Sequence, residues 1–322
     1  MTEITNFRHN HLIDPHLEIW EWQIPLYLFV GGLVAGLMIL GGIWRLMGKE
    51  KEGRALLFYG PLTAPILLSL GMVFLLLDLA YPEHVFRFYT TFEPLSPMSW
   101  GSWILLFVYP AQILALALPN GLETFKGKLR FLNPIWNIVK NIAGKAPKQI
   151  AWINVIGGAS LGIYTGILLG TVAARPLWNS AVLPPLFLVS GFSAACAFGL
   201  LAKPTSNEIK NLFRWDIAAL IIEVVLLGSW ILSLITGPTG SINAANLILG
   251  GPFTASFWVF VVFVGIALPL WLEFREMLHR PVPVWVGPAL VLVGGLALRF
   301  VIVMAGQVSH FPEIEPLISN LH

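Results

Sequence analysis

Long apolar stretches separated by short polar connections dominate the hydropathy pattern of this chain. Because crossing about 30 Å of hydrocarbon takes roughly 20 apolar helical residues, eight segments qualify as transmembrane helices. Several carry closely spaced glycines, as in "GGLVAG" and "GGASLG", which lets helix backbones approach one another. The pattern predicts an all-α integral membrane protein, a compact bundle with spans at approximately 24–46, 57–80, 102–119, 150–173, 179–202, 216–236, 253–273 and 284–305.

Lysine and arginine gather in alternate connections of this pattern. Fifteen of the 19 follow the first, third, fifth and seventh spans, and six of these lie in the longest connection, 120–149. The positive-inside rule then places the basic connections in the cytoplasm and both termini outside. We expect a multi-pass protein of the bacterial cytoplasmic membrane, with an external segment 1–20, a membrane domain 21–306 and an external tail 307–322. The first twenty residues are polar, so no signal peptide is expected.

Composition narrows the function classes. Hydrophobic residues make up 57% of the 322 and charged residues only 11%, which is too apolar for a soluble domain. The net charge of +2 gives no reason to expect a nucleic-acid partner. A single Cys cannot hold an iron–sulfur cluster, and no His lies in the middle of a span, so neither a cluster, a haem nor another metal site is expected. Any redox chemistry then depends on a ligand and on another subunit.

Ionisable side chains inside the spans are candidates for function, because they are costly in a bilayer and usually face a bundle interior, a cavity or a partner. Asp78 and Arg299, both toward the outer side, form either a structural ion pair or part of the lining of a wet pocket. Glu223 is either a core residue or part of a proton route from the inside. The candidate polar pathway comprises Asp78, Arg175, Asp216, Glu223, Arg299 and Gln307.

The outer connection 81–100, "YPEHVFRFYTTFEPLSPMSW", is rich in aromatic residues and proline. It is either an interfacial aromatic belt or a functional surface, namely a docking floor for a partner or a lid over a lipid-soluble ligand. The candidate docking residues are His84, Arg87, Pro97 and Trp100.

Taken together, several stretches resemble the NrfD/PsrC family, the quinone-binding membrane subunits of polysulfide reductase and its relatives. They are "WEWQIPLYLFVGGLVAG", "DLAYPEHVFRF…SPMSWGSW", "GIYTGILLG" with "ARPLW", and "LRFVIVMAGQ", and the likeness runs from about residue 16 to 307. The resemblance implies two four-helix bundles, about 24–173 and 179–305, and a quinone pocket near the outer face. It also implies a docked iron–sulfur subunit of the four-cluster type that is bound to a molybdopterin or other catalytic subunit.

The family pattern also suggests quinone ligands. Its members use a polar residue, often His, at the start of the first span and a Tyr on the fourth. Tyr164 matches the Tyr, whereas the first position reads Glu21, with His16 five residues earlier. Tyr164, Glu21, His16 and Trp22 are therefore the candidate quinone-binding residues, although a buried Tyr often only fills the core and a Trp often anchors the interface.

The sequence thus favours a quinone-interacting membrane anchor of a respiratory complex, with menaquinone or ubiquinone as its bound substrate. Two other classes stay open. A secondary transporter would bind its substrate at the midplane between helix repeats, and a purely structural anchor would bind no ligand.

Overall fold

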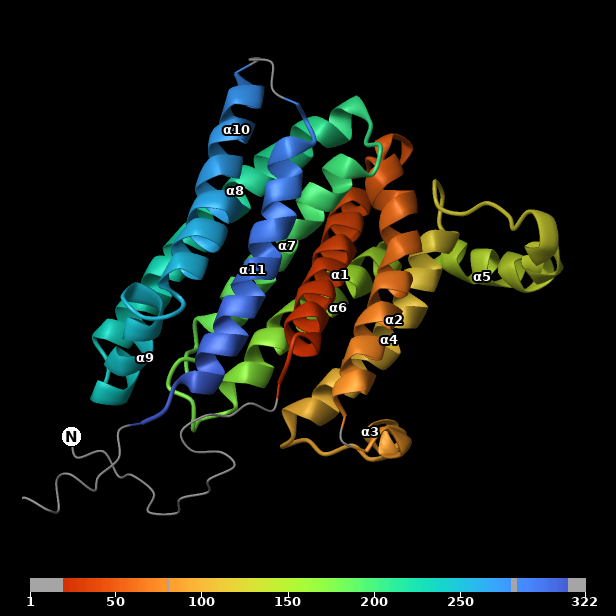
Figure 1. Ribbon diagram of the computed structural model, residues 1–322. Coiled ribbons are helices and arrows are strands. Elements are labelled where there is room, and N and C mark those ends of the chain that lie inside the picture. The colour runs from red at the N-terminus through yellow and green to blue at the C-terminus, as the bar shows by residue number, and fades with distance from the viewer. Residues whose placement is uncertain (1–19, 80, 279–282, 312–322) are drawn as a thin grey trace, which may run out of the picture.

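The computed structural model describes residues 20–79, 81–278 and 283–311, and every regular element in these ranges is a helix (Figure 1). Eight helices are long and apolar enough to cross a membrane, which confirms the predicted fold class. They are α1 (Gln23–Leu46), Ala55–Asp78, α4 (Pro97–Ala117), α6 (Pro147–Gly170), α7 (Leu183–Leu201), α8 (Ser206–Ile235), Ser256–Met277 and α11 (Val286–Val308).

Two of these spans contain π-helical backbone. The second begins with a π-helical turn, Ala55–Tyr59, and continues as α2 (Gly60–Asp78). The seventh begins as a π-helix over Ser256–Ala267 and continues as α10 (Leu268–Met277). Three short helices lie in the connections: α3 (Arg87–Thr90), α5 (Asn133–Lys145) and α9 (Thr239–Leu249).

The sixth span begins at Ser206 instead of about 216 because a polar capping motif extends the helix beyond the apolar segment. Thr205 and Glu208 form a capping box at its first turn. The buried Glu208 carboxylate also accepts hydrogen bonds from the backbone N–H groups of Arg54 (3.1 Å), Ala55 (3.2 Å) and Leu56 (2.9 Å). One carboxylate therefore caps the start of the second span and joins it to α8.

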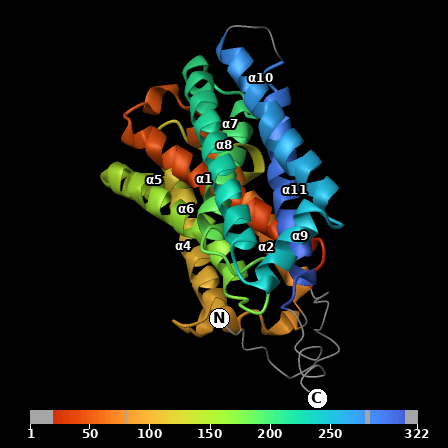
Figure 2. The same cartoon turned by 90° about the vertical axis from the view of Figure 1, so that its left-hand side faces the viewer.

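Helix α1 lies at the centre of the bundle and packs against α2, α6, α7 and α11 (Figures 1 and 2). The glycines that the sequence singled out make this possible. A Cβ at Gly36 would overlap the carbonyl oxygen of Gly191 in α7, and one at Gly158 in α6 would lie 2.6 Å from that of Ala35. Both crossings thus exclude any larger side chain.

The connections divide between two ends of the bundle. The α1–α2, α4–α6 and α7–α8 connections lie at one end, whereas α3, α9 and the α6–α7 connection lie at the other (Figure 1). The described chain ends meet at this second end, where Trp20 and Gln307 exchange two backbone–side-chain hydrogen bonds (2.9 and 2.7 Å). Residues 1–19 and 312–322, which make up most of the two predicted external segments, lie outside the described residues.

The long basic connection, expected to be a loop, contains the 3₁₀ segment Gly127–Leu132 and the 13-residue helix α5. The hydropathy pattern does not predict this helix, because its apolar residues occupy only part of its circumference and do not form a continuous apolar stretch. Trp136 and Ala143 are buried against the ends of α4 and α6, whereas Ile138 is 61% exposed.

The charge asymmetry and the fold together predict the orientation in the membrane. With Cys196 as the only cysteine and fully buried, new cysteines at exposed Lys145 and His310 probe opposite ends. We expect a membrane-impermeant maleimide added to intact spheroplasts to label the His310→Cys variant and spare the Lys145→Cys variant. The reverse pattern would mean that the basic end faces outward.

Candidate functional site

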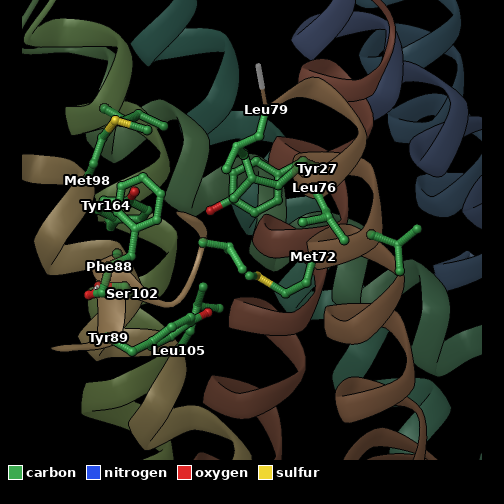
Figure 3. Close-up of a pocket in the computed structure, with 15 residues that line it drawn as sticks. Tyr27, Met72, Leu76, Leu79, Phe88, Tyr89, Met98, Ser102, Leu105 and Tyr164 are labelled. Atoms are coloured by element: carbon green, nitrogen blue, oxygen red, sulfur yellow. Dashed lines mark hydrogen bonds between the residues drawn. The ribbon is translucent and has the colours of Figure 1, made fainter. Parts of the chain in front are cut away.

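A cavity of about 310 Å³ lies between α1, α2, α4 and α6 at the end of the bundle that carries α3 (Figure 3). Val73 and Leu76 of α2 and Met98 of α4 line it and are also 39–49% exposed on the outer surface. The cavity therefore communicates with the apolar surface that faces lipid. Its lining consists of Tyr27, Met72, Val73, Leu75, Leu76, Leu79, Val85, Phe88, Tyr89, Met98, Gly101, Ser102, Leu105, Tyr164 and Leu168.

Tyrosine hydroxyls supply the polar groups of this mostly apolar cavity. Tyr27 of α1 and Tyr164 of α6 are 3% and 5% exposed, and their hydroxyl groups lie close enough to interact. Burial and the nearby Tyr109 raise the pKa of Tyr89, so its hydroxyl keeps its proton at neutral pH. The Ser102 hydroxyl is already committed, because it donates to the carbonyl oxygens of Phe88 and Ser99 (both 2.8 Å).

Gly101 of α4 sets the position of Tyr164. A Cβ at Gly101 would overlap both the Tyr164 hydroxyl oxygen and the ring carbon that bears it. The phenol therefore lies directly against the α4 backbone, and only glycine leaves room for it.

The aromatic connection between α2 and α4 covers the end of the cavity. Val85, Phe88 and Tyr89 line the cavity from this connection, while Phe86 and Phe92 are 56% exposed on its outer side. The predicted docking residues His84, Arg87 and Trp100 are exposed there, and Pro97 is half-buried at the first position of α4. One segment thus presents an inner face to the cavity and an outer face to the surroundings.

The predicted quinone ligands are only partly brought together. Tyr164 lines the cavity, whereas Glu21 and Trp22 precede α1, are exposed and are absent from the lining. Trp22 packs edge-on against Phe74, with ring centroids 5.9 Å apart. His16 lies outside the described residues.

Tyr27 and Tyr89 are cavity residues that the sequence reading missed. Tyr27 lies one helical turn inside the first span, and its position within an apolar segment was the available signal. Tyr89 lies within the aromatic connection, where one tyrosine among several aromatic residues gives no distinct signal.

A second polar group, formed by Arg299, Ser190 and Glu223, lies between α7, α8 and α11. Arg299 is fully buried; its Nη1 donates to Ser190 Oγ (2.5 Å) and to the Gly295 carbonyl oxygen (3.1 Å). Its Nη2 donates to the Phe187 carbonyl oxygen (3.0 Å). Glu223 of α8 interacts with both Arg299 and Ser190.

Asp216, Ser193 and Glu273 extend this polar group toward the basic end of the bundle. Ser193 Oγ donates to Asp216 Oδ1 (2.5 Å). The carboxyl groups of Asp216 and Glu273 lie close enough to share a hydrogen bond when one of them carries a proton. Glu273 was missed because it lies close to the basic end of an otherwise apolar span, where a carboxylate is not distinctive in sequence.

The predicted pairing of Asp78 with Arg299 is wrong. The position of a residue along a span gives its depth in the membrane but not the direction in which its side chain points. The Arg299 guanidinium points toward Ser190 and Phe187 and not toward Asp78. Asp78 is half-buried at the end of α2, where its carboxyl group interacts with Glu21.

Arg175 and Gln307 hold together the end of the bundle where the described chain ends meet, instead of extending the Arg299 group. Arg175 Nη1 donates to the carbonyl oxygen of Ser309 (2.8 Å), and Gln307 binds the backbone of Trp20. Of the six predicted pathway residues, the structure brings together Arg299, Glu223 and Asp216. The other three, Asp78, Arg175 and Gln307, lie apart from this group.

These features define a class of protein: a multi-pass helical membrane protein with an apolar cavity beneath an exposed aromatic segment and a buried polar group beside it. Comparison with known sequences identifies the family. The family described as "Polysulphide reductase, NrfD" matches residues 9–310. The chain therefore belongs to the NrfD family, as the sequence motifs predicted.

Individual relatives agree with this assignment. The C subunit of polysulfide reductase from Wolinella succinogenes is 31% identical over 90% of this chain and 94% of its own length. Protein NrfD of Escherichia coli is 29% identical over 96% of this chain and 99% of its own. A more distant relative, the Hdr-like menaquinol oxidoreductase integral membrane subunit of Archaeoglobus fulgidus, is 25% identical over 70% of this chain and 64% of its own.

The Arg299 group predicts the outcome of a double substitution. Arg299→Gln removes the cation beside the buried Glu223, so we expect less folded protein in detergent extracts, measured by fluorescence-detected gel filtration. Adding Glu223→Gln should restore much of the loss, because no buried charge then lacks its counterpart. Arg87→Gln, an exposed arginine, serves as the control. If the double variant yields no more folded protein than Arg299→Gln alone, the two side chains are not coupled.

Proposed function

We propose that this chain is the quinone-interacting membrane subunit of a respiratory oxidoreductase complex. It exchanges electrons between menaquinone or ubiquinone in the bilayer and an iron–sulfur subunit docked at the aromatic end. The observation that carries the proposal is the lipid-accessible apolar cavity with the neighbouring hydroxyls of Tyr27 and Tyr164 in its wall. The names of the relatives, which include subunits of reductases and of a menaquinol oxidoreductase, support the same reading.

The chemistry of a quinone suits this cavity. A quinone has two carbonyl oxygens that accept hydrogen bonds, an apolar ring and an apolar tail. Ligand pockets of this kind are mostly apolar, with a few polar groups that fix orientation, and begin at about 300 Å³. Tyr164 and Tyr27 can donate to a carbonyl oxygen, while the lining residues Met72, Leu76 and Leu105 would contact the ring and tail.

Oxidation of the quinol releases two electrons and two protons, and the reverse reaction takes them up. The electrons pass to or from the nearest cluster of the docked iron–sulfur subunit, which in turn serves a molybdopterin or other catalytic subunit. The membrane subunit provides the site, the orientation of the ring and groups that exchange protons. Glu21 and Asp78 are candidates for that exchange because they lie together at the cavity end, where Leu79 lines the wall directly after Asp78.

The exposed side of the aromatic connection is the proposed docking surface for the partner. His84, Arg87 and Trp100 are exposed there, and the same segment lines the cavity with Phe88 and Tyr89 on its other side. A subunit bound to this surface would be separated from the quinone only by the connection itself. Such proximity is what electron transfer between two bound groups requires.

The buried polar group around Arg299 is the proposed proton route on the other side of α1. Glu223, Asp216 and Glu273 supply carboxyl groups that can bind and release protons, and Ser190 and Ser193 link them by hydroxyls. The Asp216–Glu273 pair, which can share one proton, lies toward the basic end, near the start of α8 and the end of α10. This arrangement would connect the interior of the bundle with the side on which the basic connections lie.

A phenylalanine substitution tests the cavity. Tyr164→Phe keeps the ring and deletes one hydroxyl, and a lost hydrogen bond costs about 0.5–1.5 kcal/mol. We therefore expect a several-fold rise in the quinol KM of the assembled complex, with unchanged dye-linked activity of the catalytic subunit. Tyr59→Phe, whose hydroxyl lies at the other end of the second span, is the matched control.

Gly101→Ala strengthens this test, because its methyl group would occupy the position of the Tyr164 hydroxyl. It should impair quinol turnover more than Tyr164→Phe does. Normal quinol kinetics in both variants would show that this cavity takes no part in the reaction.

Purification of the complex separates the proposed function from the two other classes, a secondary transporter and a purely structural anchor. We expect bound quinone together with a co-purifying iron–sulfur subunit, whereas a transporter or an inert anchor would lack that combination.

A further inference from the structure

Helix α5 is an amphipathic helix whose apolar residues only partly contact the protein. Trp136, Val139 and Ala143 pack against the end of α4 and the start of α6. The indole Nε1 of Trp136 donates to the carbonyl oxygen of Leu122 (3.0 Å), and Asn133 binds the backbone of Phe125. The helix is thereby fixed to the basic end of the bundle and projects to its side (Figure 1).

A second apolar row on α5 faces away from the protein. Ile135, Ile138 and Ile142 recur at three- and four-residue spacing and are 63%, 61% and 56% exposed. Phe131, in the 3₁₀ segment just before the helix, is 71% exposed. Helix α5 packs beside the ends of α4 and α6, where Ile113, Trp152 and Ile153 are also exposed, so all three helices carry exposed apolar side chains in this region.

Positive charge accompanies this row. Lys126, Lys128 and Arg130 precede the helix and are exposed, and Lys145 and Lys148 are exposed at and beyond its C-terminal end. Lys140 is half-buried, with its ammonium group donating to the carbonyl oxygen of Glu123 (3.3 Å). Glu123 is the only acidic residue between 120 and 149, so the segment is strongly cationic.

We propose that α5 and the segment from Lys126 form a binding site for anionic phospholipid in the leaflet at the basic end. The isoleucine row enters the acyl-chain region, and the lysine and arginine side chains bind lipid phosphates. Amphipathic helices with a basic face bind membranes by this combination of apolar burial and attraction to anionic lipid. Exposure of four large apolar side chains to water is unfavourable compared with their burial among acyl chains. The positive charge of the segment complements the negative charge of an anionic headgroup. The four side chains are Phe131, Ile135, Ile138 and Ile142. The inference is independent of the proposed quinone chemistry.

Accessibility of attached nitroxides tests the orientation of α5. Single cysteines are introduced at Ile138, Ile142, Asn137 and Asn141 in a Cys196→Ala background, and the full-length protein is placed in phosphatidylglycerol–phosphatidylcholine nanodiscs. We expect positions 138 and 142 to be relaxed by oxygen and protected from a water-soluble nickel complex, and positions 137 and 141 to show the opposite. Access of nickel to positions 138 and 142 would place the row in water, and protection from both agents would mean that protein covers it. Either result overturns the proposal.

Charge substitution tests the lipid. The triple variant Lys126→Gln, Lys128→Gln, Arg130→Gln is compared with Lys51→Gln, Lys210→Gln, Arg214→Gln, which removes the same number of exposed charges at the same end. Each basic residue near an anionic surface strengthens binding roughly fivefold. The first variant should therefore retain phosphatidylglycerol at least about tenfold less well in native mass spectrometry, while the control resembles the unmodified protein.

Other results of this comparison count against the site. Equal losses in the two triple variants would show a general attraction of positive charge to anionic lipid instead of a site at α5. Unchanged retention in both variants would show that these side chains do not bind lipid phosphates at all.

Discussion

The close approach of α1 to its neighbours is the constraint on which both candidate sites depend. Gly36 of α1 meets Gly191 of α7 with no space for a Cβ, and Gly158 of α6 meets Ala35 in the same way. Helix α1 is therefore buried along most of its length. Tyr27 projects from it into the cavity, and Gly32 leaves room for the Arg299 guanidinium, whose Nη2 would lie 3.2 Å from a Cβ at this position. A larger side chain at these crossings would displace both groups.

Buried charges in this protein bind backbone groups more often than they bind each other. Glu208 accepts from N–H groups at the start of the second span. Arg45 donates to the carbonyl oxygens of Ala115 (3.0 Å) and Pro119 (3.1 Å) at the end of α4. Free N–H groups at a helix start and free carbonyls at a helix end carry partial charge, so they stabilise a buried ion without a second ion to desolvate. Arg299 also donates to backbone carbonyl oxygens, those of Phe187 and Gly295, but these lie within helices and not at a helix end. It binds the Ser190 hydroxyl and lies near Glu223 as well, and this mixed polar surrounding marks it as a functional candidate.

The cavity and the Arg299 group occupy different sides of α1 and have different chemistry. The first is apolar, opens toward lipid and is covered by an aromatic segment; the second is polar and enclosed. A quinone site coupled to a proton route needs both kinds of environment, because the quinone requires access from the bilayer while protons need groups shielded from lipid. The fold keeps these two environments apart and connects them through one central helix.

The sequence by itself determined the eight spans, the helical class and the gathering of positive charge at one end, because each depends on composition along the chain and not on neighbours in space. It also singled out Tyr164, through its position in a family motif. The sequence could not determine which side chains meet. Depth along a span does not give the direction in which a residue points, so the sequence pairs Arg299 with Asp78 and gives no sign that Glu223 is its neighbour. Tyr27, Glu273 and the exposed row of α5 became visible only in the tertiary structure, because each depends on which helix packs against which face.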